Sequence, residues 1–137
     1  MEATVEESEK LYRGVKRNKP NMLDEDGNIS SALFKDDCGV SVDRDGKREE
    51  KIIFDAMYSK LVDKSGKSRL NAVVRINAGD CIKKELFVRS EPSENDQYHA
   101  AIYENGQLEP ISNLNAAYLA SKAELVDDRR DEVMLRN

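Results

Sequence analysis

The chain is poor in the side chains that most enzymes use for chemistry. Its 137 residues include one histidine, two cysteines and no tryptophan. The cysteines, Cys38 and Cys81, are far apart, whereas zinc sites need two close-set pairs or additional histidines. No cofactor-binding motif is present. These absences predict a protein that holds no metal and no cofactor, and they favour a non-enzymatic role.

Long apolar runs and a secretory leader are absent as well. No segment approaches the roughly 20 apolar residues that a membrane span requires. The first residues are acidic, where a signal peptide would be basic and then apolar. Two cysteines without a signal peptide suit a reducing compartment. We therefore expect a cytoplasmic protein without membrane contacts.

Charge, by contrast, is abundant: 36% of the residues are charged and the net charge is -5. This balance argues against nucleic-acid binding, which would need a local basic patch. The two basic clusters, Lys16-Arg17-Lys19 and Lys83-Lys84, are short and lie beside acidic segments, which is typical of solvated surface charge. We therefore expect another protein as the partner, and a homodimer stays open.

The apolar pattern predicts one α+β domain over residues 10–126. An acidic leader, 1–9, precedes it and is expected to be flexible, and a charged tail, 127–137, follows it. Helical spacing of apolar residues indicates helices at 48–62 and 113–126. We expect these two helices to cover one face of a mainly antiparallel sheet.

Alternation and β-favouring side chains indicate five strands. Two of them, 70–78 and 82–90, are expected to form a hairpin joined at Gly79-Asp80. Phe34, Ile53 and Leu119 are predicted core residues. The expected strands are 10–16, 39–42, 70–78, 82–90 and 98–104.

The only imidazole is a candidate site residue. His99 lies between a polar loop and an apolar strand. It is either a general base oriented by Glu94 or Asp96, or a structural side chain that bonds to loop backbone. No nucleophile is marked by a motif, and a general base alone is only half of a site.

Three further residues complete the candidate set. Arg13, followed by Gly14, either presents its guanidinium to a carboxylate or phosphate or pairs with an acid at the surface. Ser41 and Asp43 share one face of a predicted strand. A Ser-Asp-His triad with His99 is not supported, because no Gly-x-Ser-x-Gly elbow is present.

Two other motifs are incomplete. Asp24, Asp26 and Asn28 have the first spacings of a calcium loop, but the glycine comes one residue early and Lys35 replaces the bidentate glutamate. Ser65-Gly66-Lys67-Ser68 matches the end of a phosphate-binding loop without its first glycine. Neither motif predicts a ligand.

Two resemblances can be drawn from short segments. Leu11-Tyr12-Arg13-Gly14 looks like the first strand of ADP-ribosyltransferase-like folds, which implies a dinucleotide-holding role for Arg13. The Ser-Thr-Ser segment of those folds is absent, so the match stops at Arg13. Four segments in order resemble a group of small uncharacterised bacterial proteins, which implies a bacterial or phage origin: Leu11-Tyr12-Arg13-Gly14-Val15, 27–34, 39–44 and 95–102.

Two functional hypotheses follow from these residues. The first is a non-catalytic protein-interaction module, such as an accessory subunit, an immunity protein or an inhibitor, acting through an acidic surface. The second is a small enzyme or nucleotide-binding domain that uses Arg13 and His99, assisted by Ser41 or Asp43. The second requires Arg13 and His99 to reach one cavity.

Overall fold

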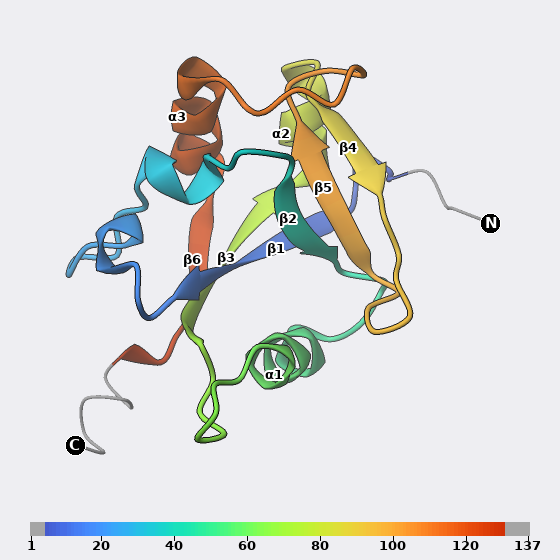
Figure 1. The fold of residues 1–137 in the computed structure, drawn as a ribbon. Helices are drawn as coiled ribbons and strands as arrows, with labels where there is room; N and C mark the ends of the chain where they lie inside the picture. The colour runs from blue at the N-terminus through green and yellow to red at the C-terminus, as the bar shows by residue number, and fades with distance from the viewer. Residues whose placement is uncertain (1–4, 131–137) are drawn as a thin grey trace.

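A six-stranded antiparallel sheet forms the centre of the molecule (Figure 1). The computed structural model describes residues 5–130, and no helix among them is long and apolar enough to cross a bilayer. The expected α+β class is confirmed. The sheet has the strand order β4-β5-β2-β1-β3-β6. The strands are β1 Lys10–Lys16, β2 Val40–Arg44, β3 Leu70–Asn77, β4 Phe87–Ser90, β5 His99–Tyr103 and β6 Glu124–Asp128.

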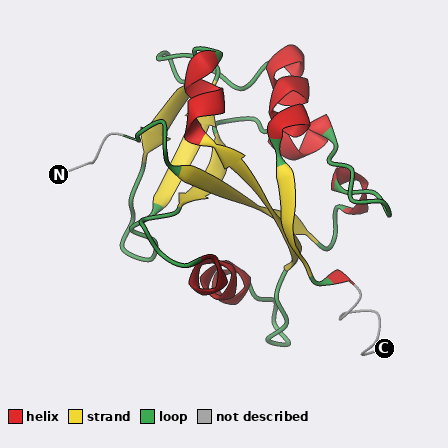
Figure 2. Ribbon diagram, turned by 180° about the vertical axis from the view of Figure 1, so that it is seen from behind, coloured by secondary structure: helices red, strands yellow, loops and turns green. Residues whose placement is uncertain are grey.

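Helices cover both faces of the sheet, as Figure 2 shows. The helix α1 (Glu50–Lys60) lies on one face, where Ile53 packs in a cluster with Tyr12 and Val73. The other face carries two α-helices and two short 3-10 helices: α2 (Ala78–Lys83), α3 (Asn113–Lys122), η1 (Pro20–Met22) and η2 (Ser31–Phe34).

The placement of α1 differs from our expectation that 48–62 and 113–126 share a face. Successive side chains of a strand point to opposite faces. In β1, Leu11 and Val15 join the core beneath α3, whereas Tyr12 joins the core beneath α1. Both faces of the central strands are apolar and therefore need cover. The helix that shares a face with α3 is α2, which the sequence analysis did not identify.

The segment after β3 also differs from the expected hairpin. Gly79 and Asp80 lie in α2, and β4 pairs with β5 instead of β3. The backbone N–H of Gly79 donates to the Glu7 carbonyl at 3.0 Å, and a Cβ at Gly79 would lie 3.1 Å from that oxygen. The glycine thus permits close packing of the N-terminal segment against α2. This packing, and not a hairpin turn, explains why a glycine stands at this position.

Both ends of the described chain are attached to the sheet. Residues 124–128, expected to span a helix end and the start of a tail, form β6 against β3. In the expected leader, Val5 is buried and Glu9 accepts a hydrogen bond from Arg44 Nε at 2.9 Å. The rest of the leader and tail, residues 1–4 and 131–137, lies outside the described residues.

Other elements form where the local sequence pattern predicts them. The strand β1 covers 10–16, and α1 lies within 48–62. Ser30 caps η2 by accepting a hydrogen bond from the Ala32 N–H at 3.1 Å. Each predicted core side chain has no exposed surface: Phe34, Ile53 and Leu119.

Candidate functional site

The sheet opens between its two central strands. The strands β1 and β2 pair only at Leu11–Arg44 and Tyr12–Asp43. Beyond these pairs β1 continues along β3 and β2 continues along β5, so the two strands diverge (Figure 1). A cavity of about 560 Å³ lies at this opening, which we call the seam cavity. Its walls come from β1, β2, α1, the two short helices η1 and η2, the first residues of β3 and β5, and the loop before β5.

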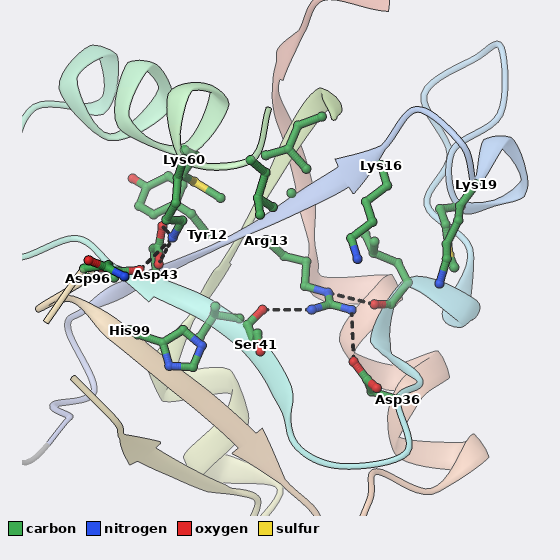
Figure 3. A pocket seen from close by; sticks show the side chains of 18 of the residues that line it. Tyr12, Arg13, Lys16, Lys19, Asp36, Ser41, Asp43, Lys60, Asp96 and His99 are labelled. Carbon is green, nitrogen blue, oxygen red and sulfur yellow. Dashed lines mark hydrogen bonds and ion pairs between the residues drawn. The ribbon is translucent and has the colours of Figure 1, made fainter. Parts of the chain in front are cut away.

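The four candidate residues all line the seam cavity: Arg13, Ser41, Asp43 and His99. They come from three strands, and the divergence of β1 from β2 places them around one opening (Figure 3). Arg13 and His99 therefore reach one cavity, as the hypothesis of a small enzyme or nucleotide-binding domain requires. Their hydrogen bonds, however, give each of them a different role.

Arg13 bridges the diverging strands. Its Nε donates to the Leu33 carbonyl and its Nη1 donates to the Ser41 carbonyl, both at 2.9 Å. The Asp36 carboxylate lies 3.9 Å from Nη2. Burial lowers the pKa of Arg13, and the charge of Asp36 opposes that effect. The guanidinium thus replaces part of the absent β1–β2 ladder while it also forms part of the cavity wall.

His99 is held by loop backbone. Its Nδ1 lies 3.1 Å from the Glu91 carbonyl oxygen, which can only accept a hydrogen bond, so Nδ1 carries the proton. In the neutral ring Nε2 is then the basic nitrogen. Among the described residues, no hydrogen bond joins His99 to Ser41 or Asp43. The three side chains therefore do not form a hydrolytic triad.

One end of the seam cavity holds a cluster of Asp43, Lys60 and Asp96, which we call the paired end (Figure 3). Lys60 Nζ lies 2.9 Å from Asp43 Oδ2 and 2.6 Å from Asp96 Oδ2. Burial and the neighbouring Asp96 raise the pKa of Asp43. Burial acts in the same direction on Asp96, but hydrogen bonds with Asp43 and Lys60 outweigh it and lower the pKa. The cluster ties α1 to β2 and to the loop before β5.

The opposite end carries Lys16 and Lys19, which we call the open end. Figure 3 shows their ammonium groups extending to the side of the cavity that holds the Arg13 guanidinium. Within residues 5–130, neither ammonium group has a hydrogen-bond or ion-pair partner. Lys35, also on the wall, instead donates to the Ile111 carbonyl at 2.7 Å. The open end thus concentrates positive charge in a chain whose net charge is -5.

Apart from these charged groups, much of the cavity lining is apolar. Side chains from both faces of the sheet contribute to it, because the diverging strands leave the opening accessible to each face. The apolar lining residues are Met22, Leu33, Val42, Met57, Leu61 and Leu70. Gly14 lies beside Leu70, and a Cβ at that position would be 2.6 Å from Leu70 Cδ1. Gly14 therefore allows Leu70 to pack against β1, which is a different role from close approach to a ligand.

The site rests on the residues of this chain, since the chain matches no protein-family model, no curated protein and no solved structure. Within the described residues, no group of three or more His, Cys, Asp or Glu side chains is arranged to hold a metal ion. Cys38 is exposed, Cys81 is buried, and both are free thiols. Burial raises the pKa of Cys81 to about 12, so this thiol is not a nucleophile near neutral pH.

The cations of the open end and the bridging amine of Lys60 were not predicted from the sequence. We interpreted Lys16 and Lys19 as solvated surface charge; both are exposed, and both also line the cavity. Asp96 was considered as an orienting partner for His99, but it binds Lys60. No sequence signal marks these roles, because they depend on where β1 and β2 separate.

Proposed function

We propose that the protein binds a small anionic ligand, of about the size of a nucleotide, in the seam cavity. The observation that carries this proposal is the open end, where two lysines that have no partner within residues 5–130 stand beside the Arg13 guanidinium. Ligand cavities typically measure about 300–1,000 Å³ and combine apolar walls with a few polar groups that orient the ligand. The seam cavity, at about 560 Å³, lies within this range of volumes and combines apolar side chains with a larger share of charged groups.

The two ends of the cavity differ in what an anion would have to displace. At the paired end an anion would compete with two carboxylates for Lys60. At the open end, neither Lys16 nor Lys19 has a partner within residues 5–130 that an anion would have to displace. The anionic group therefore binds at the open end, and the rest of the ligand lies along the apolar wall toward Met57 and Leu61.

Calorimetric titration with adenosine monophosphate tests the proposal. The double variant Lys16→Ala/Lys19→Ala should lower the affinity by at least about tenfold, because it removes two charge-assisted contacts. The matched control is Lys64→Ala/Lys83→Ala, which removes the same charge from exposed positions outside the cavity. Equal losses in the two double variants, or no saturable binding to the wild-type protein, would contradict the proposal.

The protein-interaction module is a second candidate, favoured by exposed apolar side chains. Leu114 on α3 is 81% exposed, and Phe87 is 39% exposed on β4, a strand at the edge of the sheet. Edge strands and exposed apolar residues are common features of protein contacts. Affinity purification of the tagged chain tests this role through the mass of the eluted complex. A stoichiometric partner that is lost with Leu114→Ser supports it, whereas a lone monomer contradicts it.

A further inference from the structure

A second cavity, of about 480 Å³, adjoins the seam cavity. Lys16 and Lys19 line both cavities, so the two lysines stand at the boundary between them. The loop after η1 contributes Asp24 and Glu25 to the second cavity, and β3 contributes Asn71. An anion held by these lysines therefore has space on two sides.

Asn71 owes its position to an irregularity in the sheet. The register of β1 and β3 passes from Val15–Ala72 to Lys16–Leu70, which leaves Asn71 as the extra residue of a bulge. Bulges redirect a side chain and are frequent next to functional sites. Asn71 Oδ1 is buried and has no hydrogen-bond partner among the described residues. Buried polar atoms are rarely left without a partner, so Asn71 contributes an unsatisfied acceptor beside the second cavity.

The second cavity combines apolar and charged side chains, and its guanidinium, that of Arg130, already donates to the Asp24 carbonyl at 2.7 Å. The Asp24 carboxylate is engaged by its own turn, since it accepts hydrogen bonds from the N–H groups of Asp26 and Asn28. Glu25 is exposed, and its carboxylate has no partner within residues 5–130. Together with Asn71 Oδ1, Glu25 favours a group that donates hydrogen bonds, such as an amine or a hydroxyl.

We infer that the ligand is a phosphodiester with two different arms. The phosphate lies between Lys16 and Lys19, an apolar or aromatic arm enters the seam cavity, and a donor-bearing arm enters the second cavity toward Asn71 and Glu25. A diester fits because its phosphate carries a substituent on each side, whereas a monoester leaves the second cavity empty. The inference rests on the proposed function and adds the class of ligand to it.

Two kinds of molecule carry this chemistry, and the experiment separates them. In a dinucleoside monophosphate, adenylyl-adenosine, the base of one adenosine supplies the aromatic arm, and the ribose hydroxyls and amino group of the other supply hydrogen-bond donors. A short-chain lysophosphatidylethanolamine, used below its micellar concentration, has an apolar arm and an amine. Adenosine monophosphate serves as the monoester reference. Each probe is titrated into the wild-type protein by calorimetry.

The expected result is that one diester binds about tenfold or more tightly than adenosine monophosphate, because only the diester places a hydrogen-bond donor in the second cavity. Asn71→Leu keeps the bulk of the side chain and should abolish this advantage while the affinity for the monoester stays unchanged. Asn77→Leu, on the same strand but outside both cavities, is the matched control. Glu25→Gln, at an exposed position, repeats the test without a change in the packed sheet.

The outcomes distinguish this inference from the proposed function. Binding of adenosine monophosphate that depends on Lys16 and Lys19, with neither diester binding more tightly, overturns the inference and leaves the proposed function standing. Equal losses of monoester and diester affinity in Asn71→Leu and Glu25→Gln also overturn it. If none of the three probes binds, both the inference and the proposed function are contradicted.

Discussion

Lysines stand at both ends of the seam cavity, but only at one end do they contact carboxylates of the described residues. At the paired end, Lys60 contacts Asp43 and Asp96 within 2.9 Å. At the open end, Lys16 and Lys19 have no partner within the described residues. Charge that is paired and partly buried belongs to the folded structure, whereas charge left open at a cavity is available to a ligand. The account therefore assigns stability to one end and binding to the other.

Removal of the paired amine at Lys60 should have the largest effect. Lys60→Met leaves the Asp43 and Asp96 carboxyls, 8% and 14% exposed, facing each other without a cation. Removing one partner of a buried ion pair is strongly destabilising, and we expect a loss of about 3 kcal/mol in the free energy of unfolding. Lys16→Met should change it by less than about 0.5 kcal/mol. Chemical denaturation of both variants measures the difference, and similar losses would refute the distinction between the two ends.

Arg13 lies between the two ends. Its guanidinium holds the diverging strands together and also forms part of the cavity wall. Arg13→Met removes the hydrogen bonds to Leu33 and Ser41, and we expect a loss of about 2 kcal/mol in the free energy of unfolding. Arg13→Lys should lose less, because an ammonium can keep one of the two bonds. Denaturation midpoints of the two variants give the measurement. A wild-type midpoint for Arg13→Met would show that the guanidinium does not hold the strands together.

The free energy of unfolding should also depend on pH through the paired end, by a smaller amount. The pKa of Asp43 is raised, so the folded state holds its proton more tightly than the unfolded state does, and this group's contribution to stability falls as pH rises above about 4. Lys60→Met removes the cation that opposes this effect. The loss caused by Lys60→Met should therefore be about 1 kcal/mol larger at pH 7.5 than at pH 5.

A second variant checks the origin of that pH dependence. In Lys60→Met/Asp43→Asn one of the two facing carboxyls can no longer ionise, so the additional loss at pH 7.5 should disappear. Denaturation of both variants at the two pH values provides the comparison. A difference that persists in the double variant would assign the effect to a group other than Asp43.

Much of the fold could be predicted from local patterns. The alternation of residues 10–16 marked β1, and the apolar spacing after Arg48 marked α1. These features depend on neighbours in sequence, and local propensity therefore decides them. The expected hairpin at Gly79-Asp80 failed because β4 pairs with β5, a choice made by tertiary packing.

The edge strand and the site were harder to predict for different reasons. Residues 124–128 include three acidic side chains, Glu124, Asp127 and Asp128, so their composition hides the strand β6. Such charge is common on edge strands, which must avoid further pairing. Arg13, Ser41, Asp43 and His99 were found from residue type alone. The lysines of the open end were missed because their role depends on the divergence of two strands that are distant in sequence.

The most direct test of the central claim is a titration of the isotopically labelled protein with adenosine monophosphate, followed by nuclear magnetic resonance. The account predicts that backbone amide signals of residues 13–19 and of β2 shift progressively and saturate, with much smaller changes in α3. It also predicts that Lys16→Ala/Lys19→Ala abolishes these shifts and that Lys64→Ala/Lys83→Ala does not. Unchanged spectra at millimolar ligand, or shifts centred away from the open end, would contradict the account.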